Sequence, residues 1–404
     1  MGTKIASGVS ELKYFKRNKG PLMRYFFKLI LLSISFFTLS VGASPNFIEP
    51  QPLAKRINTT VGPVKKTTPM RVPMITWGGD MVTILANGMN TRTQPDSAMA
   101  RAGLDYELVL QDNFDKQLQE YLSGDSPYLR CTIGMCNQAL DLITQDPRTY
   151  PIVIYQLTWS RGGDTLVAKN NIMRVDQLKG KTIAIQAYGP HVDFMTTLLT
   201  QAGLKMSDVN LKWMEDLTLS PNSPAEALKL NDIDASFMII SDAYGLTSGR
   251  RVGTGKNDSI EGARMIISTM YARRIIADVY VVRSDYFANH KSEVQAFVQV
   301  LMNTSQELQT LMTDLTNPRK IQLQEASAEI LLGDKTAQMD IENLYYDAQF
   351  VDKKGNMDFF ENSEFPYRLD VLNNQVQDAF NAIGLIQTKA PMVSADWDYA
   401  LISE

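Results

Sequence analysis

A single stretch in the middle of the chain, residues 176–204, limits the possible folds more than any other part of the sequence. It begins with the apolar run Lys181–Ala187, breaks at Gly189 and Pro190, and continues with apolar residues at three- and four-residue spacing up to Gly203. The run is typical of a strand covered on both faces, and the spacing is typical of an amphipathic helix. We therefore predict a strand, a turn and a helix. The free N–H groups of such a helix start lie beyond the carboxyl end of the strand, where open α/β sheets hold small ligands.

Similar units repeat on both sides of this stretch. Strands are predicted at 74–77, 106–110, 129–133, 151–157, 165–169, 210–214, 234–240, 264–269 and 279–283. Helices are predicted at 81–89, 114–122, 135–144 and 224–230, and helical patterns dominate from 285 to 386 with an interruption near 353–362. This alternation predicts an α/β protein with mostly parallel sheets flanked by helices. A chain of 404 residues can bury two cores of ordinary size, so we expect two lobes.

The N-terminal region is typical of an exported protein. Seven basic residues precede an apolar run from Leu29 to Val41, and small residues follow up to Ala43. We predict a secretory signal peptide over 1–43, cleaved after Ala43, with Met23 as an alternative start and an uncleaved anchor as the minor alternative. Residues 44–71 contain five prolines and are predicted to be an extended leader or linker. No later segment is apolar and long enough to cross a membrane.

The net charge and the cysteine content of the chain reduce the number of function classes that fit it. Without residues 1–43 the chain has 33 Lys and Arg against 43 Asp and Glu, a formal charge of −10, which argues against nucleic acid as a partner. Cys131 and Cys136 have no nearby histidine or second cysteine pair, so we expect neither a metal site nor a cofactor. A disulfide between them is an alternative, but buried free thiols are the favoured interpretation. Known hydrolase, metalloprotease and phosphate-loop motifs are absent, and with two histidines in the chain we expect no enzyme.

Candidate ligand contacts lie in the turns that follow the predicted strands, because such turns gather along one edge of an α/β sheet. Aromatic faces, glycines and a few polar groups are what a small-molecule site requires. Each of these residues has a structural alternative, since large aromatics are usually core and aspartates often cap helices. The candidates are Trp77, Gly78, Gly79, Asp80, Met135, Asn137, Trp159, Arg161, Asp164, Tyr188, Gly189, His191, Asp242 and Asp278.

The segment Asp176–Ile185, DQLKGKTIAI, resembles the opening of the second lobe in substrate-binding proteins of ABC transporters. The similarity is greatest to the branch that binds nitrate, taurine, alkanesulfonates and thiamine pyrimidines. It continues at 203–209, at 226–236 and from Asp278 into the long helix that follows, and it covers roughly 72–312. One departure is Asn231, which stands where the family usually has glycine before Asp232.

This resemblance implies the two-lobe periplasmic binding protein fold, type II, in which a hinge motion traps the ligand between the lobes. It implies a first lobe of 72–160 and 276–386, a second lobe of 161–275 and a C-terminal extension of 387–404. The crossovers would lie near 159–164 and 274–278. The expected partners are a small-molecule ligand and an inner-membrane ABC permease, and the protein is expected to be a periplasmic monomer.

The identity of the ligand stays open. Asp80, Asp164 and Asp278 favour a cationic or zwitterionic compound, whereas Arg161 and the helix start near His191 favour an anionic group. Together they suggest an amphoteric molecule such as an amino-sulfonate or a heterocyclic amine. Two alternatives remain: a periplasmic sensor or adaptor, and an enzyme like the pyrimidine synthases on the same fold.

Overall fold

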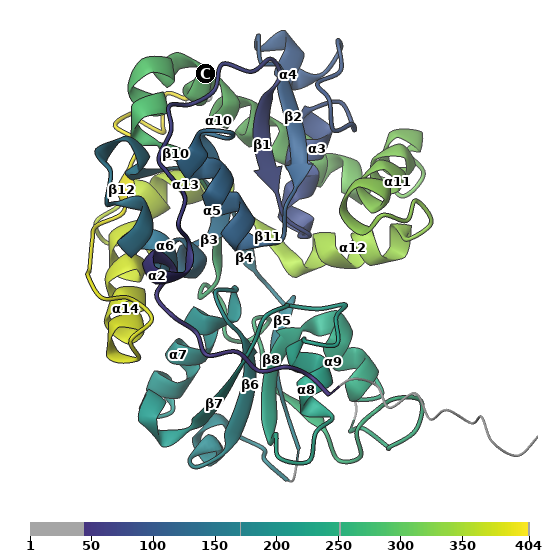
Figure 1. The fold of residues 1–404 in the computed structure, drawn as a ribbon. Helices are drawn as coiled ribbons and strands as arrows, with labels where there is room; N and C mark the ends of the chain where they lie inside the picture. Colours follow the sequence, from purple (N-terminus) through teal and green to yellow (C-terminus); the bar gives the residue numbers. More distant parts are fainter. Residues whose placement is uncertain (1–43, 170, 250–251, 403–404) are drawn as a thin grey trace, which may run out of the picture. The chain divides into compact units, whose positions relative to one another are not determined.

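The computed structural model describes residues 44–169, 171–249 and 252–402. Pro45–Glu404 forms one compact unit, which holds two α/β lobes (Figure 1). The signal peptide predicted for 1–43 lies outside the described residues. Among the helices of the described ranges, none is long and apolar enough to span a membrane.

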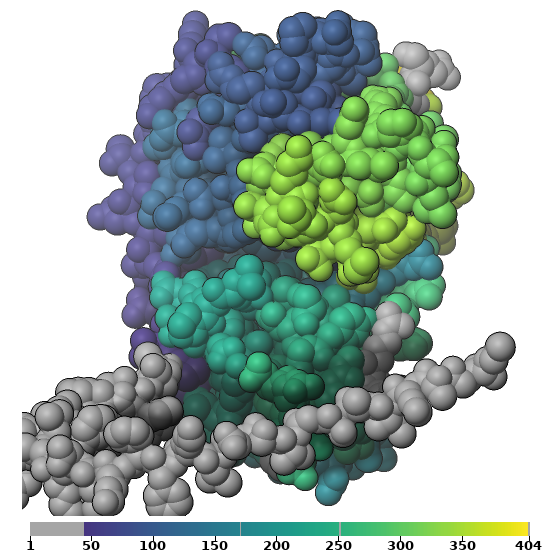
Figure 2. All heavy atoms as spheres, turned by 90° about the vertical axis from the view of Figure 1, so that its right-hand side faces the viewer, coloured from purple at the N-terminus to yellow at the C-terminus, as the bar shows by residue number. Residues whose placement is uncertain are grey.

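The first lobe is built on a sheet with the strand order β11-β4-β10-β3, and β1 and β2 form a parallel pair beside it. Its strands are β1 (Met70–Met74), β2 (Tyr106–Leu110), β3 (Tyr128–Thr132), β4 (Pro151–Ser160), β10 (Ala277–Arg283), β11 (Ala348–Phe350) and β12 (Val393–Ser394). Its longer helices are α3 (Met81–Ala86), α5 (Phe114–Ser123), α6 (Ile133–Ile143), α10 (Ser284–Thr313), α11 (Pro318–Leu332), α12 (Gln338–Asp347), α13 (Lys353–Phe360) and α14 (Leu369–Ala382). Shorter helical turns are η1 (Gly78–Asp80), α4 (Ala98–Arg101) and η2 (Pro147–Thr149). In Figure 2, the light green residues of α11 and α12 project from this lobe just above the second one.

The second lobe is built on the sheet β7-β6-β8-β5-β9. Its strands are β5 (Asp164–Ala168), β6 (Thr182–Gln186), β7 (Asn210–Met214), β8 (Ala235–Ile239) and β9 (Arg264–Ser268). Its helices are η3 (Val175–Leu178), α7 (His191–Gln201), η4 (Met206–Asp208), α8 (Pro224–Leu228) and α9 (Ile240–Leu246). The strand, turn and helix predicted from residues 176–204 are therefore β6 and α7, and the predicted α/β class is confirmed.

Strand pairing differs from the prediction. The sheets are mixed rather than mostly parallel, because β10 pairs antiparallel with both β3 and β4, and β5 pairs antiparallel with both β8 and β9. Apolar strands of five residues look alike in either direction, so the sequence pattern did not distinguish the two arrangements. The predicted interruption near 353–362 was also wrong in part, since α13 occupies most of it.

Residues 45–69, which we call the N-terminal strap, are packed against both lobes rather than free. In the second lobe, Ile48 pairs with Trp213 and the backbone of Gln51 bonds to Tyr188. In the first lobe, the short helix α2 (Leu53–Arg56) buries Leu53 completely in the main core. The prolines that indicated an extended leader thus produce a segment that follows the protein surface.

The C-terminal segment is also ordered. Its strand β12 pairs in parallel with β4, and Tyr399 is buried with its hydroxyl donating to the carbonyl of Ile154. The carboxylate of Asp141 on α6 accepts bonds from the backbone N–H groups of Gln387 and Thr388. The segment is therefore a strap across the first lobe.

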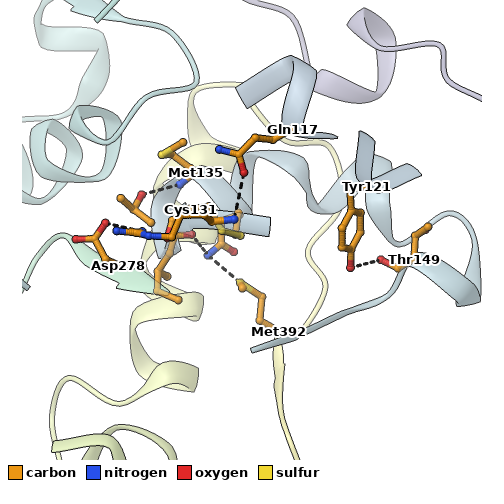
Figure 3. Close-up of a disulfide and its surroundings, with 12 residues drawn as sticks. Gln117, Tyr121, Cys131, Met135, Thr149, Asp278 and Met392 are labelled. Atoms are coloured by element: carbon orange, nitrogen blue, oxygen red, sulfur yellow. Dashed lines mark hydrogen bonds and ion pairs between the residues drawn. A yellow bond between two sulfur atoms is a disulfide. The ribbon is translucent and has the colours of Figure 1, made fainter. Parts of the chain in front are cut away.

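Cys131 and Cys136 form a disulfide, which corrects the preference for free thiols (Figure 3). Cys131 lies on β3 as expected, but the chain turns directly into α6, so that Cys136 returns to within 6.0 Å between Cα atoms. Both side chains are fully buried. The bond ties the end of β3 to the first turns of α6.

Candidate functional site

The first lobe contributes a buried ion triad at the end of its central strands. Arg130 lies in the middle of β3, where its guanidinium donates to the carboxylate of Asp80 at 2.9–3.1 Å and to Asp278 at 2.9 Å. Asp278 also accepts from the hydroxyl of Thr158 on the neighbouring strand β4 at 2.9 Å. All four side chains are nearly or completely buried. Asp80 and Asp278 are thus brought together as predicted, through an arginine that the prediction had missed.

The second lobe contributes a pair at the start of β5 and α7. The carboxylate of Asp164 lies 2.7 Å from Nε2 of His191 and accepts from the hydroxyl of Ser160. Ser160 also lies 2.7 Å from the hydroxyl of Thr269, where the chain leaves β9. His191 is completely buried, and its other ring nitrogen, Nδ1, has no hydrogen-bond partner among the described residues. The positive φ of Tyr188 and the residues Gly189 and Pro190 form the tight turn that puts His191 at the helix start.

The two groups meet where α7 of the second lobe contacts α6 of the first. Asp193, in the first turn of α7, packs on Gly134: an added Cβ at Gly134 would lie 2.5 Å from Cγ of Asp193. Asp193 is fully buried, and both of its carboxylate oxygens lack a hydrogen-bond partner in the described part of the chain. We call Asp80, Asp164, Asp193 and Asp278 the interlobe acidic cluster.

Burial dominates the electrostatics of this cluster. It raises the pKa of Asp80 to about 7 against the opposing charge of Arg130, and it raises the pKa of Asp278 in the same way. The pKa of Asp193 is raised well above its usual range by burial and also by the charges of Asp164 and Asp278. The N–H groups of Asp193 and Phe194 lower it only in part, since neither reaches hydrogen-bond geometry with the carboxylate. The cluster therefore holds more carboxyl groups than cationic partners, and burial favours the neutral forms of Asp80, Asp193 and Asp278.

The predicted aromatic contacts are distributed differently. Trp77 is half-buried, donates from Nε1 to the hydroxyl of Thr158 at 2.9 Å and lies against Gly163 at the crossover between the lobes. Trp159 instead belongs to the core, with its ring edge-on to Phe359 and Tyr367. The hydroxyl of Tyr188 is hydrogen-bonded to the backbone of Gln51 in the N-terminal strap. Of the three rings, only Trp77 is placed beside the polar network.

The remaining candidates have mainly structural contacts. Gly78 and Gly189 are close-packed, since an added Cβ would lie 2.0 Å from the carbonyl oxygen of Leu344 and 1.9 Å from Oε1 of Gln186, respectively. Gly79 packs on Thr158 and Trp77. Arg161 is exposed, with its N–H donating to the carbonyl of Asp347 at 2.7 Å.

On α6, Met135 and Asn137 are buried. Figure 3 shows Met135 beside the disulfide, and Asn137 donates to the carbonyl of Ile133 and to the sulfur of Met392. Asp242 lies inside α9 rather than in a turn, and burial raises its pKa. Ligand contact by any of these residues stays a prediction.

Two members of the network were not predicted. Arg130 could have been predicted from the sequence, because a charged residue inside the apolar run of β3 requires a buried counter-charge. Asp193 could not have been predicted, because an acidic residue in the first turn of a helix is common on solvated surfaces. Only the packing of α7 on α6 distinguishes it.

Two surface cavities lie away from this network. One of about 330 Å³ lies between α4 and α10, and one of about 410 Å³ lies between α13, the start of α14 and the C-terminal strap. Within the described ranges, no group of three or more His, Cys, Asp or Glu side chains is arranged to hold a metal ion.

Comparison with known proteins assigns the chain to a family. The NMT1/THI5-like family model matches residues 101–309, more than half of the chain. The chain belongs to the NMT1/THI5-like family. The matched span of this NMT1/THI5-like protein contains Arg130, Asp164, Asp193 and Asp278, whereas Asp80 precedes it. Among curated proteins, none matches the sequence.

Solved structures have the same fold as this NMT1/THI5-like protein. The periplasmic aliphatic sulphonate binding protein SsuA from Escherichia coli superposes with a TM-score of 0.56 at 13% identity, covering 81% of this chain and 94% of that one. The alkanesulfonate-binding SsuA from Xanthomonas axonopodis, bound to MOPS, gives 0.54 at 13% identity, covering 82% and 100%. A Candida albicans protein with the generic periplasmic binding protein fold gives 0.51 at 11%, covering 82% and 99%. The predicted two-lobe periplasmic binding protein fold is confirmed.

Proposed function

We propose that this protein is a periplasmic solute-binding protein, which holds a small polar or aromatic molecule between its lobes and delivers it to an ABC permease in the inner membrane. The observation that carries the proposal is the convergence of buried polar groups from both lobes. Asp278 and Arg130 come from the first lobe, and Asp164, His191 and Asp193 come from the second. Polar atoms buried without partners cost free energy, and a ligand that supplies partners would offset this cost.

The proposal also covers export of the protein and the boundaries of its two lobes. We propose that the signal peptide over 1–43 is cleaved after Ala43, and that the mature protein acts as a monomer. We also propose 72–160 with 276–386 as the first lobe and 161–275 as the second. In support, β4 ends at Ser160 and β5 begins at Asp164, while β9 ends at Ser268 and β10 begins at Ala277, so both crossovers fall near these boundaries.

Ligand entry requires the lobes to separate. The cluster residues are buried, and the contact between Gly134 and Asp193 closes the interface over them. A hinge at the two crossovers would open this interface, as in other two-lobe proteins. The N-terminal strap bridges the lobes as well, so we propose that it bends or detaches during opening.

We propose an amphoteric ligand, such as an amino-sulfonate or a heterocyclic amine. The acidic cluster supports a cationic group, and the indole of Trp77 supports contact with a ring or an alkyl chain. The start of α6, which meets the second lobe at Gly134, supports an anionic group.

The test is thermal melting of residues 44–404 with nitrate, sulfonates, amino acids, polyamines and pyrimidines. A ligand at about 100 times its Kd adds about 2.7 kcal/mol, which raises Tm by a few degrees. Small-angle X-ray scattering with and without the ligand found should show lobe closure as a smaller radius of gyration. If no compound shifts Tm, the solute-binding proposal fails for these classes, and a sensor or adaptor that reads a protein partner becomes the better hypothesis.

A further inference from the structure

The charges at the interface do not balance. Arg130 is the only Lys or Arg that pairs with the acidic cluster in the described ranges, and its guanidinium is shared by Asp80 and Asp278. His191 contacts Asp164. Four carboxyl groups thus have one guanidinium and one imidazole as partners. Asp193 is the carboxylate that remains without a cationic partner.

Asp193 is also directed into the interface rather than into solvent. It lies in the first turn of α7 in the second lobe, and a Cβ added at Gly134 in the first lobe would lie 2.5 Å from its Cγ, so only a glycine leaves room there. Its side chain is fully buried and both oxygens are unpartnered among the described residues. Nδ1 of His191, in the same helical turn, is a second buried atom without a partner. Isolated buried carboxylates are costly unless they are paired or protonated.

The groups that face Asp193 define what can neutralise it. Asp164 on β5 and Asp278 on β10 are close enough to raise its pKa, and α6 presents the glycine backbone. None of these supplies a cation. A bare metal ion fits poorly, because no trio of ligating side chains converges in the described residues. A protonated amine fits better, since its N–H groups donate to carboxylate oxygens.

We propose that Asp193 binds a protonated amine of the ligand, so that the ligand class is that of organic cations or zwitterions bearing an N–H group. This inference rests on the solute-binding function proposed above and specifies its ligand. While the lobes are closed without a ligand, burial raises the pKa of Asp193 and favours its neutral form. When the amine enters, the carboxyl loses its proton and the charge pair forms, so binding releases a proton to the buffer.

The test uses matched pairs of probes on residues 44–404: taurine against ethanesulfonate, and putrescine against 1,4-butanediol. Each pair differs chiefly in the amine. We expect an amine to raise Tm and its amine-free partner to leave Tm unchanged. We expect Asp193→Asn to weaken binding of that amine at least tenfold, a loss of about 1.4 kcal/mol. Asp258→Asn, an exposed change in the same lobe, is the control and should bind as the wild type does.

Titration calorimetry of the wild type in buffers of different ionisation enthalpy gives a second readout, which does not depend on a variant that folds. We expect proton release on binding of the amine. Three results would overturn the cation assignment while leaving the solute-binding function intact: an amine-free probe that binds equally well, an amine whose affinity survives Asp193→Asn, or binding without proton release. If neither amines nor amine-free compounds shift Tm, both proposals fail for these compound classes.

Discussion

Replacement of Gly134 by alanine tests the contact between the lobes. The new Cβ would lie 2.5 Å from Cγ and 2.6 Å from Oδ1 of Asp193. Carbon atoms in good contact are about 3.5–4.0 Å apart, so the two helices must separate by about 1 Å or Asp193 must leave its rotamer. Overpacking of this kind costs about 1–3 kcal/mol. We expect Gly134→Ala to lower the free energy of unfolding by that amount, measured by urea unfolding followed by circular dichroism.

A double-mutant cycle of Gly134→Ala with Asp193→Ala tests whether the loss of stability comes from the contact between these two residues. Asp193→Ala removes the atoms that the new methyl group would meet, so Gly134→Ala in that background should no longer destabilise. It should instead be neutral or stabilise by up to about 1 kcal/mol, because alanine has the higher helix propensity. Gly245→Ala in α9 is the matched control, since nothing lies within 4 Å of its added Cβ. Equal stability of Gly134→Ala and wild type, or the same loss in both backgrounds, would refute the interlobe contact.

Three further predictions concern the strap, the disulfide and pH. Tyr188→Phe removes both hydrogen bonds to Gln51, worth about 1–3 kcal/mol, and should speed proteolysis within the strap; an unchanged cleavage rate would exclude this anchor. Replacement of both Cys131 and Cys136 by alanine should destabilise by on the order of 2 kcal/mol, the value for so short a loop, and an unchanged urea midpoint would contradict it. The pKa of Asp80 is raised from 3.8 to about 7, so the folded state binds more protons and stability should fall as pH rises between these values, by up to about 4 kcal/mol. Urea unfolding that is flat or rises from about pH 5 to about pH 8 would show that Arg130 keeps Asp80 ionised.

The elements near residues 176–204 were predictable because local pattern determines them. The run of small and apolar residues became β6, and the stripe that begins at His191 became α7. The turn residues Gly189 and Pro190 also took their predicted positions. Strand direction was not predictable, since β10 pairs with β3 about 150 residues away in the chain and with β4 about 120 residues away.

The placement of candidate residues was predictable where a residue's position in the chain implies its position in the fold, although their contact with a ligand stays a prediction. Asp80, Asp164, His191 and Asp278 lie beside strand ends and do enter the buried network. Trp159 also lies near a strand end, but its ring does not reach the network. Alternate residues of a strand face opposite sides, and the ring of Trp159 faces the core cluster with Phe359.

The sequence by itself determined the α/β class, the family and the acidic character of the chain, because periodicity, ordered motifs and net charge are properties of the order of residues alone. Only the tertiary structure decided that the N-terminal strap bridges both lobes, that Cys131 and Cys136 are bonded, and that Asp193 faces Gly134. These features depend on distances between segments far apart in the chain or on how a turn closes. Burial, which makes Asp193 unusual, arises only when two helices from different lobes pack together.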